Sequence, residues 1–429
     1  MSVDTLGWVV NAYTLAFAVL LLTGAALGDR LGRRRVFAAG ILLFSAASAG
    51  CALADSTEML IGFRALQGAG AAMVMPLSLT LLTDAFPPGK RGLALGIWSG
   101  ISGLGVAAGP VIGGAVVDGI SWHWIFWPNV PLGIACAVLA VRHMSESRGV
   151  ARRLDPAGMA LAGGGLLGIV WGLVRGNEQG WTSPEILLAL SLGTLLLAAF
   201  VAWQARSAEP MLPLGMFRSR GFTVANVVSV AMYFGMFGAI FFLAQFLQTV
   251  QGHSPLRAGL MILPWTVMPM FVAPIAGALS DRIGARPLMV GGLALQAAAL
   301  AWLALASTPD VGYAALFVPF AMAGAGMALV FPPVANLLVA SVPESRIGVA
   351  SGANNTMREV GGAMGIAVMT AVFTARGSYE SPQAYVDGLT PAVLVGAAAV
   401  AVGAVLALWV PARRRGAANP AAVASATAA

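Results

Sequence analysis

Apolar runs long enough to cross a bilayer recur along this whole chain, and they constrain its fold more than any other feature. A helix needs about 20 predominantly apolar residues to span the hydrocarbon core. Of the 429 residues, 59% are hydrophobic and only 10% are charged, whereas soluble domains carry roughly 25% charged residues. One buried core cannot enclose so much apolar surface, so most of it must face lipid. We therefore expect an all-α polytopic membrane protein.

Charged breaks divide the chain into thirteen expected spans. Several are longer than a perpendicular helix requires, so we expect tilted helices or protruding ends. The expected limits are 8–28, 35–54, 58–84, 92–117, 128–143, 157–174, 185–204, 222–249, 257–280, 287–306, 312–340, 346–375 and 390–410.

The distribution of Lys and Arg predicts which loops face the cytoplasm. Nineteen of the 24 basic residues fall in one set of alternate loops, and only Arg175, Arg257 and Arg376 fall in the other. The remaining two, Arg64 and Arg358, lie inside spans. The basic set predicts cytoplasmic loops, a cytoplasmic C-terminus and an N-terminus outside. This placement also explains the net charge of +7, so we expect no nucleic-acid partner.

An internal repeat relates the two ends of the chain. At an offset of 256 residues, Gly-Ala-Gly at 68–70 matches 324–326, and the similarity extends to positions 96 and 352. At an offset of 252 residues, Gly-Asp-Arg-Leu-Gly-Arg-Arg at 28–34 matches Ser-Asp-Arg-Ile-Gly-Ala-Arg at 280–286. Both loops lie on the basic side, so the repeat is parallel. Two parallel halves with substrate bound between them are the architecture of rocker-type secondary transporters.

The repeat and the span count together predict the domain organisation. We expect an N-terminal bundle at 1–150, two additional central helices at 151–206 and a C-terminal bundle at 207–411. Residues 412–429 are Ala-rich, and we expect them to form a disordered cytoplasmic tail. The single Lys and the abundance of Ala, Gly and Arg indicate a GC-rich bacterial genome, and hence a plasma membrane location.

Arg64 and Gln67 are candidates for a transport role. Arg64 lies roughly 9 Å inside its span at 1.5 Å per residue, and a charge there costs ~2.5–3.5 kcal/mol unless it faces a polar cavity. The repeat has Phe320 and Ala323 at these positions, so the fold does not require the polar pair. An Arg that snorkels to the membrane surface is the alternative.

Arg358 and Glu359 form a second intramembrane pair, about a dozen residues into the span that starts near 346. A carboxyl group inside a span is a functional candidate because it can exchange a proton. Neighbouring residues on a helix point about 100° apart, so the two charges do not simply neutralise each other. If this helix protrudes from the bilayer, both residues only flank the membrane, and this alternative stays open.

Two Gly-rich segments are candidates for conformational change. The tight loop at 24–35 carries Asp29, Arg30, Arg33 and Arg34, and it is echoed by Asp281 and Arg282. Such charges can form a latch that opens when the halves rock, or they can serve only to orient the protein in the membrane.

The second segment predicts a hinge. Gly105, Gly109, Gly113 and Gly114 place small residues on one face of a span and permit close helix packing. Pro110 interrupts the same face and breaks the helical hydrogen bonding.

These segments resemble the 14-helix branch of the major facilitator superfamily, the drug:proton antiporters of the EmrB/QacA type. The loop at 24–35, Arg64 with Gln67, the glycines with Pro110, and the segment from Ser121 to Gly133 carry the likeness. It implies two six-helix bundles with two extra central helices, and export of small amphipathic drugs or metabolites in exchange for protons by alternating access. Arg64 and Gln67 would lie on the proton route, Pro110 in a hinge and Asp29 in a cytoplasmic gate.

The resemblance has one departure. The family's first helix, with its Asp-x-Thr-Ile-Val-Asn-Val-Ala-Leu-Pro signature, has no match here, in agreement with thirteen spans and an outside N-terminus. We therefore expect the chain to lack that helix, which places the activity of this form in question.

Two other functions stay open: a dedicated exporter of one cognate metabolite, and an inactive or non-transport membrane protein. We do not expect an enzyme, because the chain has no nucleophile–base constellation, phosphate loop or metal motif. We likewise expect no cofactor and no metal, and we expect a monomer whose partners are a small amphipathic substrate, protons and the lipid bilayer.

Overall fold

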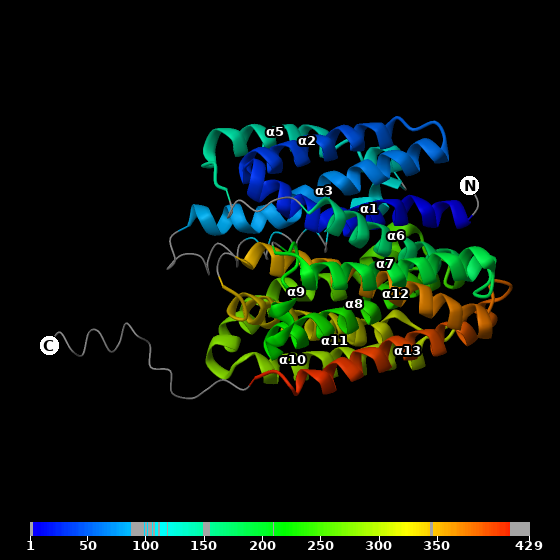
Figure 1. Ribbon diagram of the computed structural model, residues 1–429. Helices are drawn as coiled ribbons and strands as arrows, with labels where there is room; N and C mark the ends of the chain where they lie inside the picture. Colours follow the sequence, from blue (N-terminus) through cyan, green and yellow to red (C-terminus); the bar gives the residue numbers. More distant parts are fainter. Residues whose placement is uncertain are drawn as a thin grey trace.

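The computed structural model describes residues 3–86, 98, 101, 105, 108–109, 112–117, 119–148, 155–208, 210–343 and 346–411. All regular secondary structure in these ranges is helical, and the long helices run roughly along one common direction (Figure 1). The α-helices are α1 (Val3–Leu31), α2 (Arg33–Ala52), α3 (Thr57–Ala85), α5 (Asn129–His143), α6 (Pro156–Gln179), α7 (Pro184–Arg206), α8 (Arg220–Gln245), α9 (Pro255–Ile283), α10 (Ala285–Ala306), α11 (Tyr313–Ala340), α12 (Ile347–Arg376) and α13 (Pro382–Ala407). Shorter 3-10 helices at Trp122–Ile125 and Leu214–Arg218 and a π-helix at Phe246–Val250 extend them.

Ser-Pro pairs fix where several helices begin. Ser183, Ser254 and Ser381 each accept a hydrogen bond from the backbone N–H three residues on, and a proline follows each serine at the first helical position. The serine satisfies an orphan N–H of the first turn, and the proline has no N–H to leave unsatisfied. The Ser381–Pro382 pair explains why α13 begins at Pro382. The sequence prediction placed its start at 390, because Tyr385 and Asp387 interrupt the apolar run.

Ten helices in the described part of the chain are long and apolar enough to cross a membrane, and the bent pair Ala12–Leu21 and Thr23–Leu31 within α1 makes an eleventh. The prediction of a polytopic all-α membrane protein is confirmed. Helix α12 is long enough but carries Asn, Arg and Glu side chains that lower its hydropathy. The span expected at 92–117 lies largely outside the described residues, as do Pro110 and the tail at 412–429.

In the described part of the N-terminal half, the long helices are α1, α2, α3 and α5. Helix α3 is central, since it packs most extensively against both α1 and α2, and α5 packs on the outer side of α2 (Figure 1). Among the described residues of this half, buried apolar side chains form clusters around Leu21, Leu77 and Cys51.

The C-terminal half contains α8 to α13. Helix α8 packs against α12 and α13, and α11 packs against α9 and α10. A single contiguous apolar core runs through this half, with Phe242, Leu300 and Phe320 among its fully buried side chains.

Glycine contacts demonstrate the parallel repeat in three dimensions. Gly70 of α3 lies against the backbone of Gly40 and Phe44 on α2, and Gly326 of α11 lies against Gly292 and Gln296 on α10. A side chain at either glycine would collide with these backbones. The same two offsets, 252 and 256 residues, therefore relate both the sequences and the helix contacts.

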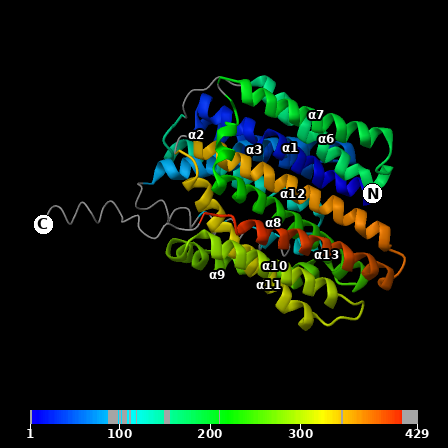
Figure 2. The same ribbon diagram turned by 60° about the horizontal axis from the view of Figure 1, so that its bottom comes forward.

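Helices α6 and α7 pair with each other beside the seam between the two halves (Figure 2). Helix α6 contacts α1 of the N-terminal half and α12 of the C-terminal half. The halves also meet directly where α1 and α3 contact α12, and where Gly114 lies against Pro255 and Leu256 at the start of α9.

Candidate functional site

Arg64 lies inside α3 and points into the N-terminal half. Its Nε donates to the backbone carbonyl of Val9 on α1 at 3.0 Å, and its Nη1 donates to Oε1 of Gln67 at 2.6 Å. The guanidinium stacks over the ring of Tyr13, 4.4 Å from the ring centroid, with Phe126 at 6.0 Å. No carboxylate of the described residues lies within ion-pair distance of Arg64. The two residues predicted together are thus in direct contact.

Hydrogen bonds connect Gln67 to α2 and, through Ser48, to α5. Its Nε2 donates to the hydroxyl of Ser48 at 3.0 Å, and Nδ2 of Asn129 donates to the same hydroxyl at 3.0 Å. The Ser48 hydroxyl in turn donates to the backbone carbonyl of Phe126 at 3.0 Å. Ser48 and Gln67 are almost completely buried, at 0% and 2% exposure.

Two glycines let the helices approach closely enough for these contacts. Gly68 lies directly against the backbone of Tyr13 and Phe17, and this contact sets α1 on α3 with the Tyr13 ring over Arg64. Gly133 of α5 lies directly against the hydroxyl of Ser45 on α2. A side chain at either position would push the helices apart and separate the polar groups.

Arg358 and Glu359 point in different directions from the middle of α12. Arg358 lies between two aromatic rings of its own half, 4.4 Å from the centroid of Tyr233 and 4.3 Å from that of Phe331, and donates to Asn355 at 3.1 Å. Glu359 interacts electrostatically with Tyr13 of the N-terminal half. Its carboxyl forms no hydrogen bond or ion pair with any described residue, and part of its surface stays accessible.

Glu359 is unusual among the acidic residues. Those in the other described helices, such as Asp29, Asp84, Glu185 and Asp387, lie within about a turn and a half of a helix end. Glu359 lies twelve residues from the start of α12 and seventeen from its end. In the described part of the chain it is therefore the one carboxyl group deep inside the bundle.

A buried amide cluster joins α8 to α12, and the sequence did not indicate it. Nδ2 of Asn354 donates to Oδ1 of Asn226 at 3.1 Å and to the hydroxyl of Ser229 at 3.0 Å. Asn226 and Ser229 are each 1% exposed. The cluster lies about one turn from Arg358 along α12 and fixes that helix against α8.

The Gly-rich basic loop between α1 and α2 forms a network with other ends of its own half. Arg33 bridges Asp29 and Asp84, at 2.9 Å to each carboxylate. The backbone N–H of Arg34 donates to Glu146 at 3.0 Å, and Gly32 supplies a backbone φ of 112° that favours glycine. The partners that the structure gives Arg33 and Arg34 all belong to the N-terminal half, and Arg30 is exposed at the end of α1.

The remaining predicted residues lie apart from this network. Asp281 and Arg282 belong to the last turns of α9, and Arg282 is exposed. Gly105, Gly109 and Gly113 have open space where a side chain would stand, whereas Gly114 packs on α9. Because Pro110 lies outside the described residues, the hinge stays a prediction.

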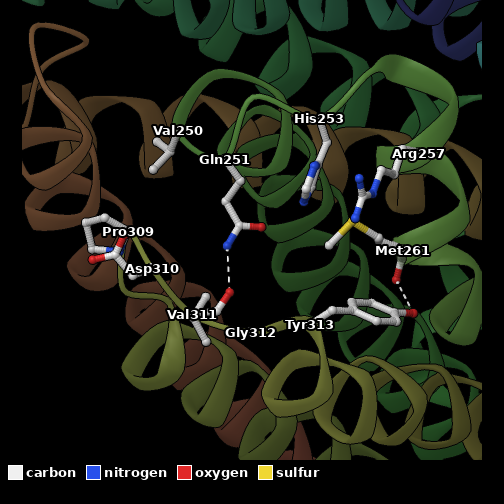
Figure 3. A pocket seen from close by; sticks show the side chains of 10 residues that line it. All are labelled: Val250, Gln251, His253, Arg257, Met261, Pro309, Asp310, Val311, Gly312 and Tyr313. Carbon is white, nitrogen blue, oxygen red and sulfur yellow. Dashed lines mark hydrogen bonds between the residues drawn. The ribbon is translucent and has the colours of Figure 1, made fainter.

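One cavity lies near Tyr13 and Arg64, and another lies apart from the predicted residues. The first, an apolar cavity of about 740 Å³, lies between α1, α3 and α6, and Ala12 and Ala65 on its wall are the sequence neighbours of Tyr13 and Arg64. A second cavity, of about 510 Å³, lies at the loops that precede α9 and α11 and includes His253, Arg257 and Tyr313 (Figure 3). In it Gln251 donates to the carbonyl of Val311 and Tyr313 donates to that of Met261 (Figure 3). None of the predicted transport residues lines the second cavity.

The described residues contain no group of three or more His, Cys, Asp or Glu side chains that could hold a metal ion.

Comparison with known proteins gives a consistent result. The sequence profile described as Major Facilitator Superfamily matches residues 1–366. The tetracenomycin C resistance and export protein of Streptomyces glaucescens is 35% identical over 394 residues, 91% of this chain and 73% of that protein. The multidrug export protein EmrB of Escherichia coli K12 is 31% identical over 379 residues, 88% of this chain and 74% of that protein. The multidrug efflux pump LfrA of Mycolicibacterium smegmatis is 36% identical over 409 residues, 95% of this chain and 80% of that protein.

Solved structures share the fold at much lower identity. An auto-inhibited peptide transporter of the POT family superposes with a TM-score of 0.68 at 17% identity, covering 97% of this chain and 90% of that one. The human organic anion transporter MFSD10 superposes with a TM-score of 0.65 at 15% identity, covering 94% of this chain and 83% of that one. At such identities these two structures bear on the fold alone.

Proposed function

This chain belongs to the major facilitator superfamily, and on that premise we propose that it exports small amphipathic drugs or metabolites from the cell in exchange for protons. The names of its relatives support export, since they describe multidrug and antibiotic resistance proteins. No nucleotide-binding domain interrupts the helices in the described part of the chain, which leaves an ion gradient as the natural energy source.

Glu359 is the observation that carries proton coupling. It is the one carboxyl group deep inside the described helices, it lacks a hydrogen-bond or ion-pair partner there, and it interacts electrostatically with Tyr13 of the other half. A carboxyl group in such a place can release and bind a proton as the halves rock.

The exchange follows from one group serving two ligands. The ionised carboxylate of Glu359 attracts a cationic or hydrogen-bond-donating part of the substrate. A proton that enters from outside binds a carboxylate oxygen, removes the negative charge and weakens the substrate contact. Substrate then leaves to the outside, and proton loss to the cytoplasm restores the carboxylate. Alternating exposure of one site to the two sides makes each transfer depend on the other.

The apolar cavity beside Arg64 suits the rest of an amphipathic substrate. Nearly all of its lining is aliphatic, with Trp171 and Arg175 at one end. Arg64 directly precedes the wall residue Ala65 in sequence. In this proposal, Arg64 and Gln67 keep the proton route polar in the N-terminal half.

The proposal includes the placement of the chain. The basic loops, including the one at Arg33, face the cytoplasm of a bacterium, the C-terminus is inside, and the protein acts as a monomer in the plasma membrane. The loop network at Arg33 acts as a cytoplasmic gate, together with Asp281 and Arg282, and the glycines near Pro110 act as a hinge.

A dedicated exporter of one compound is the second candidate. It is favoured by the relative from Streptomyces glaucescens, which is named for resistance to and export of tetracenomycin C alone. A panel of chemically distinct substrates separates the two candidates, because a dedicated exporter drives proton release with only one of them.

The test uses purified protein in liposomes that enclose a pH-sensitive dye. Ethidium is added against an imposed proton gradient, and proton flux is compared for the wild type, Glu359→Gln and Asp387→Asn. Asp387 is the control because it is exposed near the start of α13, where it accepts a hydrogen bond from Gln383, away from the cavity. We expect substrate-driven proton flux in the wild type and in the control, and none in Glu359→Gln, which still exchanges substrate without a gradient. Equal flux in Glu359→Gln and the wild type would exclude Glu359 as the coupling group.

A further inference from the structure

We propose that Ser48, Gln67 and Asn129 form a positioning node for Arg64, and that Ser48 is its central residue. The node is a chain of buried hydrogen bonds that fixes where the guanidinium lies and which way its donors point. This inference rests on the proposed function only in giving Arg64 a part in proton-coupled transport; the geometry of the node is independent of it.

Ser48 uses its full hydrogen-bonding capacity. A hydroxyl group has one donor and two acceptor sites. Gln67 and Asn129 each donate to the Ser48 oxygen at 3.0 Å, and its proton goes to the carbonyl of Phe126, also at 3.0 Å. Because all three sites are occupied and the residue is fully buried, the hydroxyl has no freedom to turn.

The fixed hydroxyl sets the orientation of the Gln67 amide. A backbone carbonyl accepts only, so Phe126 forces Ser48 to donate to it and to accept from Gln67. The Gln67 Nε2 must then face Ser48, and its Oε1 must face Arg64. The contact of Oε1 with Nη1 at 2.6 Å is the result. A reversed amide would set an N–H group against the guanidinium and leave Arg64 without its acceptor.

The node draws its members from four places in the N-terminal half. Ser48 belongs to α2, Gln67 to α3 and Asn129 to the first residue of α5, while Arg64 also holds the carbonyl of Val9 on α1. Any movement of one helix against the others strains a buried hydrogen bond. Arg64 therefore moves with its half as one body when the halves rock.

Packing alone does not require the node. At the repeat offsets, Ser48, Arg64 and Gln67 correspond to Leu300, Phe320 and Ala323. All three of these are fully buried in the apolar core, and their helices α10 and α11 pack as extensively as α2 and α3 do. Apolar residues thus build this interface equally well, and the polar set in the N-terminal half serves Arg64.

The test compares Ser48→Ala with two partners. Ser48→Thr keeps the hydroxyl, and Ser45→Ala removes a hydroxyl one turn earlier on the same buried face. Ser45 donates to the backbone carbonyls of Ile41 and Asn129 and touches neither Gln67 nor Arg64. It therefore matches Ser48→Ala in burial and chemistry. Its contact with Asn129 is to the backbone carbonyl, at 3.3 Å, and is not one of the side-chain hydrogen bonds that form the node.

The first readout does not depend on transport. In ¹⁵N-arginine-labelled protein in nanodiscs, the Arg64 Nε–H resonance is assigned by its loss in Arg64→Lys, and Arg358 serves as an internal reference. We expect Ser48→Ala to speed solvent exchange of the Arg64 Nε–H at least about 10-fold, with Arg358 unchanged. Ser45→Ala and Ser48→Thr should leave the solvent-exchange rates of both Nε–H groups near their wild-type values. An exchange rate of the Arg64 Nε–H that is unchanged in Ser48→Ala would overturn the node.

The second readout is the coupling of transport. We expect Ser48→Ala to lower ethidium-driven proton flux about 10-fold and to shift its pH profile, while substrate counterflow stays within about 3-fold of wild type. In the Arg64→Gln background, Ser48→Ala should change neither quantity further, because the residue that it positions is gone. Equal losses of flux and counterflow would show a merely structural role and overturn the proposal. A wild type without ethidium-driven flux would refute the proposed function and leave the node to the resonance test.

Discussion

Two corresponding places in the two halves have the same backbone geometry and opposite chemistry. In the N-terminal half, Gly68 brings α1 onto α3, and the ring of Tyr13 lies over the guanidinium of Arg64. In the C-terminal half, Gly324 brings α9 onto α11, and the ring of Trp265 lies beside the ring of Phe320, 6.2 Å between centroids. The glycine that sets the helix contact is kept in both, so the exchange of Phe for Arg is separable from the fold.

The cores differ in the same sense. At equivalent positions, Ser48, Arg64 and Gln67 form a polar network between α2 and α3, whereas Leu300, Phe320 and Ala323 are fully buried in an apolar core. The expected transport groups do not follow this division: Arg64 and Gln67 lie in the N-terminal half, and Arg358 and Glu359 lie in the C-terminal half. Glu359 interacts electrostatically with Tyr13 of the other half. The seam is where the two kinds of interior meet.

Phe320→Arg should have the largest effect of the variants considered, because it should destabilise the folded protein most. It transfers the charge of the N-terminal half into the apolar core, beside Trp265 and without the acceptors that serve Arg64. An unpaired buried charge places this variant in the extreme class, at about 4–5 kcal/mol of destabilisation. We expect little folded protein, measured by size-exclusion chromatography of a fluorescent fusion. A variant as stable as wild type would show that the apolar core tolerates a buried guanidinium without the hydrogen-bond acceptors that Arg64 has.

Arg64→Leu is the reciprocal change and separates function from stability. Phe320 occupies the equivalent position in the C-terminal half and is fully buried, so an apolar side chain can pack at position 64 and we expect folded protein. Coupled transport should fall about 100-fold, which corresponds to about 2.7 kcal/mol of activation free energy. Proton flux in liposomes and a thermal melt of the same sample give both quantities. Lost folding together with lost transport would contradict the separation.

Asn354→Leu tests whether the amide cluster of the C-terminal half is structural. The change leaves the Asn226 carbonyl oxygen without its donor at a buried position. We expect about 1–3 kcal/mol of destabilisation. The thermal melt should shift while the ratio of proton flux to substrate flux stays at the wild-type value. A changed ratio would place this cluster in the coupling route.

Arg33→Gln should have the smallest effect. Arg33 bridges Asp29 and Asp84 and is 17% exposed, but the two acids are 32% and 40% exposed. Exposed ion pairs contribute about 0–1 kcal/mol and weaken with salt. We expect a small loss of stability at low ionic strength that disappears at about 1 M salt, where the Debye length is ~3 Å. A loss that persists in high salt would mean that the network acts through hydrogen bonds rather than charge.

The sequence predicted the helices and the isolated charges well, because both are local signals. Apolar runs and charged breaks gave the limits of α10 and α11 to within two residues, and a charge inside an apolar run singled out Arg64 and Glu359. The direct contact of Gln67 with Arg64 follows from their spacing of three residues on one helix face.

Contacts between helices were not predictable in the same way. Ser48 and Asn129 are ordinary polar residues in their segments, and they become a node only when α2, α3 and α5 converge. The same holds for Asn226 and Asn354, which lie 128 residues apart in sequence. One signal could have found Ser48: comparison of the repeat halves pairs it with Leu300, as it pairs Arg64 with Phe320.

The most direct test of the account is the release of protons when substrate binds to purified protein in weakly buffered detergent solution. If substrate and proton compete for the carboxyl group of Glu359, ethidium should displace a proton from the wild type. The number of protons released per bound ethidium should fall at pH values above the pKa of that group. Glu359→Gln should bind ethidium and release none. Proton release from Glu359→Gln that equals the wild type would contradict the central claim that this carboxyl couples the two ligands.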